Sequence, residues 1–327
     1  MDKGGQTLKN KLTLFAALCG LFVLVFASRQ AIESCRYGLT LCLELIIPSL
    51  FPFFFLSILL SRLGFPEWLG SRLSKPASSL FHVSGNGITA LFIGLCGGYP
   101  MGAAYLADLI REGLITQKEA EHLLAFCNNS GPAFLIGAIG AGVFESAKIG
   151  LVLYLVHVLS ALLCGILLRD PSIPGGDIKK RETRQVNTLS HLLPEAVEQT
   201  VSSLLNVCGF VVCFSVFTGL LNTNGIMNAF INKLSTAIHI KPQPLQALLI
   251  GFFELGSGIG ALQDLPPTPL HLAIASAVVG WGGISVHFQT YSVLADTDIK
   301  GTLHTAGRLF NALFSFILSY SLFSFRS

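Results

Sequence analysis

The stretch GLCGGYPMGA (94–103), with FCNNSGPAF (126–134) shortly after it, puts glycine, proline and carboxamide side chains inside an otherwise apolar run. Much further along the chain the layout recurs, as GFFELGSGIGAL (251–262) and VGWGGISVHFQTYSVL (279–294). Irregular backbone at membrane depth is tolerated only where protein or a water-filled cavity surrounds it. Paired interrupted segments in matching halves of a chain therefore predict a transporter-type binding site between the halves.

The composition excludes a soluble globular protein. The 327 residues are 52% hydrophobic and 12% charged, and the mean hydropathy is +0.66. A soluble domain carries about 25% charged residues. The net charge of +3 is too small to indicate nucleic-acid binding. None of the eight cysteines has C-x-x-C spacing, so we expect neither a zinc site nor a disulfide framework.

Several segments approach the roughly 20 apolar residues that a membrane span needs. The candidate spans are 12–28, 38–61, 87–110, 123–143, 147–168, 195–221, 245–263, 269–294 and 303–323. Glycine and proline breaks predict that some of them are re-entrant hairpins or broken helices. The first run has a length that also suits a signal peptide, with a small-residue cleavage site at Val25–Ala27, but we favour an uncleaved span because many spans follow it.

The polar segments between the runs predict an orientation. Amphipathic pieces at 65–80 and 226–238 are typical of helices that lie at the membrane surface. Thr116, with Glu119 three residues on, predicts a helix start that continues into 123–143. The basic linker 169–191 and the lysine-bearing N-terminus are predicted to be cytoplasmic. After the first span the chain is outside the membrane, so the four candidates between that span and the linker must supply an odd number of crossings. We therefore expect one of these four not to cross.

The linker separates two halves with the same order of elements. We therefore expect an all-α, polytopic helical membrane protein built from two inverted repeats with broken or re-entrant helices. The predicted parts are an N-terminal membrane span at 1–32, a first repeat at 33–168, the cytoplasmic linker at 169–191 and a second repeat at 192–327.

Three strings carry a family resemblance: GGYPMG (97–102), CNNSGP (127–132) and GGISVH (282–287). The chain resembles the sporulation integral membrane proteins of the YlbJ type, within the nucleoside-recognition, or Gate-domain, family, over roughly residues 35–323. The resemblance implies kinship with concentrative nucleoside transporters and with the gate segments of ferrous-iron transport proteins. The GTPase module of the iron transporters is missing, because no Gly-x-x-x-x-Gly-Lys-Ser/Thr string occurs.

Glu254 is the strongest single candidate for a binding residue. A carboxylate inside an apolar run is costly in lipid and indicates function by default; Ser257 marks the unwound stretch beside it. Asn128, Asn129 and Ser130 could line a polar site just before a Gly-Pro break. The structural alternatives are that the carboxylate caps a broken helix of the other half, and that the carboxamides satisfy freed backbone groups.

The glycine-rich turns supply the remaining candidates. Gly97, Gly98 and Tyr99 are predicted to form a hairpin tip or an unwound turn, with tight helix packing as the alternative. His287 and Gln289 hold the position in the second half that the asparagine pair holds in the first. His287 could relay protons, but a lone histidine is more often a packing residue.

These residues predict binding rather than catalysis. No enzyme signature occurs, and Ser285 and His287 would lie on different helix faces, so we expect no catalytic residues, no metal site and no cofactor. The predicted partners are the lipid bilayer and a small polar solute, nucleoside-like as one option and accompanied by a coupling cation as another. The alternative is a membrane scaffold for spore development with a degenerate transport fold. The oligomeric state is not indicated.

Overall fold

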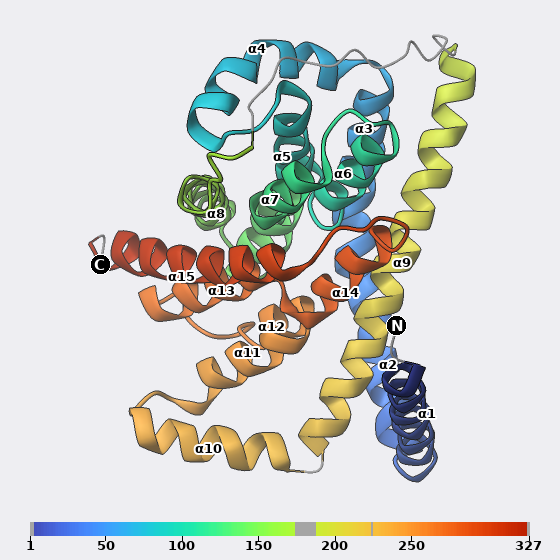
Figure 1. The fold of residues 1–327 in the computed structure, drawn as a ribbon. Coiled ribbons are helices and arrows are strands. Elements are labelled where there is room, and N and C mark those ends of the chain that lie inside the picture. Colours follow the sequence, from blue (N-terminus) through green and yellow to red (C-terminus); the bar gives the residue numbers. More distant parts are fainter. Residues whose placement is uncertain (1–2, 174–187, 224, 326–327) are drawn as a thin grey trace.

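The computed structural model describes residues 3–173, 188–223 and 225–325 (Figure 1). These residues form helices joined by turns, with no β-strand among them. The all-α prediction is therefore confirmed. Most of the predicted linker, residues 174–187, lies outside the described residues.

The first half runs from the N-terminus to the linker. Its elements are α1 (Lys3–Phe26), α2 (Ser28–Leu41), the π-helical segment η1 (Cys42–Ile46), α3 (Ile47–Arg62), α4 (Phe65–Phe81), α5 (Gly85–Gly97), α6 (Met101–Arg111), α7 (Gln117–Cys127), the π-helical segment η2 (Ala133–Val143) and α8 (Ala147–Leu167). The segments α2, η1 and α3 continue one another and form a single long helix, Ser28–Arg62.

The second half follows the linker. Its elements are α9 (Leu189–Thr223), α10 (Ile226–Ile238), α11 (Pro242–Phe253), α12 (Leu255–Gly260), α13 (Pro269–Trp281), α14 (Gly283–Val293) and α15 (Thr302–Ser324). The long helix α9 packs along α2 and α3 (Figure 1). Helices α4 and α10, which the sequence predicted as surface helices, lie at opposite ends of the molecule (Figure 1).

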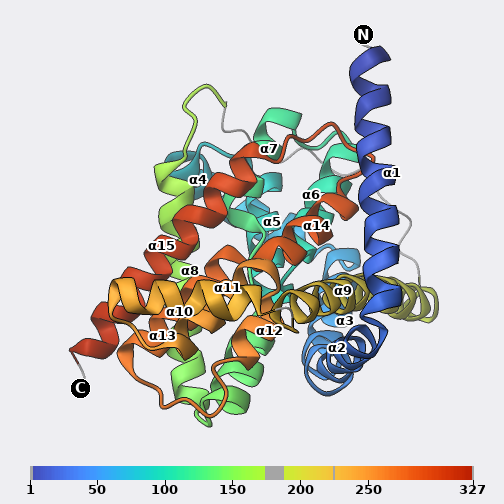
Figure 2. The same ribbon diagram turned by 90° about the horizontal axis from the view of Figure 1, so that it is seen from below.

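Five helical segments among the described residues are long and apolar enough to cross a membrane. They are Ser28–Arg62, Ala147–Leu167, Leu189–Asn222, Pro269–Val293 and Thr302–Ser324. Helices α4 and α5 form a further pair, bent by 93° at the break between them. The apolar part of α1, Lys11–Phe26, is shorter, and α1 runs across the direction of α9 (Figures 1 and 2). The N-terminal span therefore stays a prediction.

Helix α15 shows how the protein suits a bilayer. Its outward face exposes Leu309, Leu313 and Ile317, each one helical turn from the next. Its buried face consists of Gly307 and five polar residues: His304, Arg308, Asn311, Ser315 and Ser319. An apolar stripe of this kind on the outside, with polar groups inside, is the reverse of a soluble helix and fits contact with lipid.

Two of the candidate spans are hairpins, one of the two forms that their glycine and proline breaks predicted. The expected span 87–110 divides at Gly98–Pro100, and its halves α5 and α6 pack against each other. The expected span 245–263 divides at Glu254 into α11 and α12, which also pack together. Glycine and proline at the first tip, and a buried cap at the second, let the chain turn back without losing backbone hydrogen bonds.

The helix that starts at Thr116 ends sooner than its sequence predicted. The Thr116 hydroxyl accepts from the Glu119 N–H at 3.2 Å, which confirms the cap. However, α7 stops at Cys127 and a new segment begins at Ala133, because Asn128–Pro132 break the helix. In a capping box the Glu119 carboxylate would accept from the Thr116 N–H. Here it accepts from the Ser84 N–H at 2.6 Å instead and so joins α7 to the start of α5.

Candidate functional site

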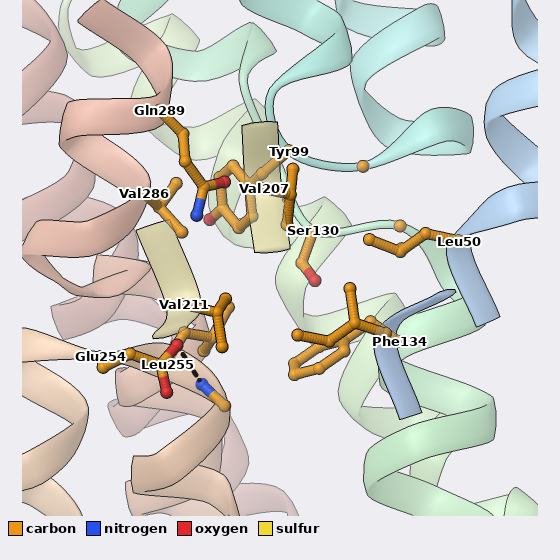
Figure 3. Close-up of a pocket in the computed structure, with 14 residues that line it drawn as sticks. Leu50, Tyr99, Ser130, Phe134, Val207, Val211, Glu254, Leu255, Val286 and Gln289 are labelled. Atoms are coloured by element: carbon orange, nitrogen blue, oxygen red, sulfur yellow. Dashed lines mark hydrogen bonds between the residues drawn. The ribbon is translucent and has the colours of Figure 1, made fainter. Parts of the chain in front are cut away.

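A small pocket of about 50 Å³ lies where the two halves meet (Figure 3). Each half contributes a long helix, a hairpin tip and an interrupted span. The first half supplies Ile46, Leu50, Gly98, Tyr99, Ser130, Gly131 and Phe134, and the second supplies Val207, Val211, Glu254, Leu255, Gly256, Val286 and Gln289. A pocket of this volume has room for roughly one or two water molecules.

Glu254 connects the pocket to the second hairpin. Its carboxylate accepts from the Gly256 N–H at 2.9 Å and from the Ser257 N–H at 2.5 Å, so it caps α12 (Figure 3). Its side chain is almost fully buried. The helix that Glu254 caps, α12, belongs to the second half, like Glu254 itself. The structural alternative predicted from the sequence was a cap on a broken helix of the first half. A negative group at a helix N-terminus satisfies otherwise free donors and matches the local dipole.

Tyr99 holds the first hairpin tip to the second half. Its hydroxyl donates to the Val279 carbonyl at 2.9 Å and accepts from Arg308 Nη1 at 2.9 Å. The sequence reasoning did not single out Arg308, because one arginine near the end of an apolar helix looks like a surface anchor. The signal that could have found it is the spacing of polar residues along 304–319, which recur every three or four positions.

The asparagine pair lies behind the pocket wall and joins the halves. Asn128 Nδ2 donates to Thr290 Oγ1 at 2.7 Å, across the two interrupted spans. Asn129 Nδ2 donates to the Phe126 carbonyl at 2.6 Å. Of the three candidates at this break, only Ser130 lines the pocket, and its backbone N–H donates to His157 Nε2 at 3.1 Å.

The other candidates separate into lining and supporting residues. Gly98 and Gln289 line the pocket, and Gly97 lies in the last turn of α5 beside it. Ser257 lines a neighbouring cavity. His287 is buried against the rings of Trp281 and His304, with centroids 4.3 and 4.9 Å away.

Two larger cavities flank the pocket. The α6 cavity, about 540 Å³, is lined by α3, α6, the first part of α9 and the loop after α14. The α12 cavity, about 340 Å³, is lined by α2, the last part of α9 and α12. Because the central pocket borders the middle of α9, the three spaces follow one another along that helix.

An exposed ion pair forms one wall of the α6 cavity. Arg111 Nε and Nη2 donate to the two Asp296 oxygens at 2.9 and 2.7 Å, which joins α6 to the loop after α14. The hydrogen bond from Arg111 lowers the pKa of Asp296 below its ordinary value. The Arg111–Asp296 pair therefore stabilises the folded protein fully above the ordinary aspartate pKa of about 4. This stabilisation is lost as the pH falls through the lower pKa that Asp296 has in the folded protein.

We expect amide hydrogen exchange in residues 294–301 to stay slow down to about pH 4 and to become faster only below it, after correction for intrinsic rates. The Asp296→Asn variant should exchange faster at neutral pH already. Equal protection of the variant and the wild-type chain at neutral pH would contradict this role of the pair.

The chain has a clear relative among known proteins. It is 31% identical over 330 residues to "Sporulation integral membrane protein YlbJ" of Bacillus subtilis (strain 168), covering 94% of this chain and 81% of that protein. The chain belongs to the YlbJ family. Membership of the YlbJ family, together with the apolar helices, identifies an integral membrane protein and confirms the resemblance to YlbJ-type proteins.

The YlbJ-type fold has a solved counterpart. A structure of a CNTnw variant, described as being in the intermediate 3 state, superposes with a TM-score of 0.52, covering 100% of this chain and 88% of that chain. The sequence identity is 14%, so the likeness concerns the fold alone. No protein-family model matches the chain.

Proposed function

We propose that this YlbJ-family protein is transporter-like and moves a small polar solute through the central pocket. The observation that carries the proposal is the composition of the pocket wall. Matching elements of both halves, namely a long helix, a hairpin tip and an interrupted span from each, converge on one space. The Glu254 carboxylate, the Gln289 carboxamide and the Ser130 hydroxyl offer hydrogen bonds there, in an otherwise apolar wall, as in sites for small molecules.

Helix α9 supports a route through the protein. Its lining residues are polar at the α6 cavity (Gln199, Ser202 and Ser203), apolar at the pocket (Val207 and Val211) and polar again at the α12 cavity (Ser215, Thr218 and Asn222). The long helix opposite has the same order, with Ser57 and Ser61 at one end, Ile46 and Leu50 in the middle, and Glu33 and Ser34 at the other end. Two cavities with polar residues on both long helices, and a more apolar constriction between them, suit a transport route.

The two halves are proposed to be inverted repeats that expose the pocket alternately to each side. The position of α4 and α10 at opposite ends supports this arrangement (Figure 1). The linker is proposed to be cytoplasmic, which would open the α6 cavity to the cytoplasm because α9 starts there. The N-terminus is proposed to lie on the same side, which requires α1 to cross the membrane, since α2 starts at the α12 cavity. The pocket chemistry suits solutes with hydroxyl and amide groups, so nucleosides are the first class to test.

The alternative function is a membrane scaffold for spore development, with no transport. The small volume of the pocket favours it, because a solute would need the pocket to widen. Purified chain in liposomes, tested for uptake of labelled nucleosides, nucleobases and neutral amino acids, separates the two. We expect uptake of at least one class above that of empty liposomes, and uptake equal to that of empty liposomes for every class would favour the scaffold.

We expect cysteines placed along α9 to react from opposite sides of the membrane. In a background without the native cysteines, Ser202→Cys should react with a membrane-impermeant thiol reagent from the cytoplasmic side and Thr218→Cys from the other side, because each lines a polar cavity. Leu205→Cys is the matched control, since Leu205 lies on the outward, apolar face of the same helix and should stay unreactive. Reaction of Ser202→Cys and Thr218→Cys from the same side would contradict the proposed route.

A further inference from the structure

Arg308 is the largest fully buried side chain in the described part of the chain. Its contacts there are neutral oxygens: the Tyr99 hydroxyl at 2.9 Å, Asn129 Oδ1 at 3.2 Å and the Ala125 carbonyl at 3.5 Å. No carboxylate within ion-pair distance of it is found among the described residues, although buried charges in proteins are normally paired. A guanidinium keeps its proton in proteins, so this positive charge needs another source of compensation.

The end of α7 provides that compensation. The last four carbonyls of a helix lack helical partners, and they carry the negative end of the helix dipole. Three of these carbonyls in α7 are bound by side chains: Leu124 by His304 Nδ1 at 3.2 Å, Ala125 by Arg308, and Phe126 by Asn129 Nδ2 at 2.6 Å. Because a carbonyl can only accept, the His304 nitrogen here must carry its hydrogen.

The fourth carbonyl, that of Cys127, is covered by the first hairpin. A Cβ atom added to Gly94 or Gly102 would lie 1.8 or 2.4 Å from this oxygen, so the α5–α6 hairpin packs directly on it. Each of the last four carbonyls of α7 is therefore either bound by a side-chain donor or covered by a closely packed glycine.

Broken helices in transporters commonly use such freed carbonyls to coordinate a coupling cation. The sequence predicts a coupling cation as one option beside the small polar solute. The residues at the break in the first half do not fit a coupling cation. The carbonyl, carboxamide and hydroxyl oxygens that would coordinate such a cation are already bound to the Arg308 guanidinium. In the second half, the Glu254 carboxyl group is likewise bound to the start of α12.

We infer that Arg308 is a resident cation that occupies the place of a dissolved coupling cation, so that the solute is uncharged and moves without Na⁺ or K⁺. This inference rests on the proposed transport function. The first broken region already holds a buried guanidinium, and the second holds a buried carboxyl group that is bound to its own helix start. A charged solute would add a further buried charge without a partner, which is strongly unfavourable in a low-dielectric interior.

The test is thermal unfolding of the purified chain in detergent, in NaCl, KCl or choline chloride, each at about 150 mM so that general screening is equal. We expect the same unfolding temperature for the wild-type chain in all three salts. Arg308→Lys should behave likewise, because it keeps a cation at the site. Arg308→Met should unfold at a lower temperature and regain on the order of 5 °C in NaCl or KCl, since a free cation can then occupy the vacated oxygens.

Three results would overturn the inference: stabilisation of the wild-type chain by Na⁺ or K⁺ relative to choline, equal salt responses of the two variants, or no salt response of Arg308→Met. Should Arg308→Met fail to fold, the wild-type measurement decides alone, with insensitivity supporting the inference and stabilisation overturning it. No solute is present in this experiment, so its outcome is independent of the uptake assay, whose failure would count against the proposed function instead.

Discussion

Replacing Gly307 by alanine is expected to destabilise the protein by on the order of 3 kcal/mol. A Cβ atom at this position would lie 2.0 Å from the Ala125 carbonyl oxygen and 2.7 Å from its carbon. Both are backbone atoms of α7, so the clash cannot be relieved by turning a side chain. Helix α15 would have to move away from α7, and the neighbouring contact from Arg308 to the same carbonyl would lengthen. Thermal unfolding in detergent should show a drop of about 4 °C.

Gly209→Ala is the matched control for this effect. Gly209 also lies inside a long helix, α9, but no atom comes within 4 Å of an added Cβ. Alanine there removes backbone freedom from the unfolded chain and should be neutral or stabilising by up to about 1 kcal/mol. A similar unfolding temperature for the Gly307 and Gly209 variants would show that α15 and α7 are not packed as described.

Replacing Glu254 by alanine is expected to have a similar cost, about 3 kcal/mol. Two buried N–H groups, those of Gly256 and Ser257, would lose their acceptor, and each unsatisfied group costs about 1–3 kcal/mol. Glu254→Gln should cost less, because one carboxamide oxygen can still accept although the negative charge at the helix start is lost. Hydrogen exchange at these two amides should become much faster in the alanine variant and moderately faster in the glutamine variant.

Ser257→Ala separates the cap from the serine side chain. This change keeps the backbone N–H that Glu254 accepts from and removes the hydroxyl, which lies 3.4 Å from Ser215 Oγ and also interacts with the Glu254 carboxyl group. The cost should stay below about 1 kcal/mol. If Ser257→Ala were as destabilising as Glu254→Ala, the carboxylate would not be what holds the second hairpin tip.

The positions of the helix breaks could be predicted from sequence, but their geometry could not. The chain is interrupted at all four marked places: the Gly98–Pro100 turn, the residues after Cys127, Glu254 and Gly282. Glycine, proline and buried polar groups disfavour a continuous helix locally, so the sequence contains this information. Whether the chain then turns back, as in the two hairpins, or continues, as at the other two breaks, depends on neighbouring helices that the local sequence does not specify.

The candidate site was predicted in part. Glu254, Ser130, Gly98, Tyr99 and Gln289 line the pocket, whereas Asn128 and Asn129 lie behind its wall. Adjacent residues at a helix break point in different directions, and only the packed structure shows which direction faces the cavity. Arg308 was missed because its importance comes from contacts with residues about 180 to 210 positions away, at the end of α7 and the first hairpin tip.

The sequence by itself determined the membrane environment, the helical class and the places where helices break. These properties follow from local composition: apolar runs need lipid or a core, and glycine, proline and buried polar residues interrupt them. Tertiary structure alone decided which freed backbone groups meet which side chains. A buried guanidinium at a helix C-terminus and a buried carboxylate at a helix N-terminus are tolerable only when distant segments close around them, because charge compensation in a low-dielectric interior acts through space rather than along the chain.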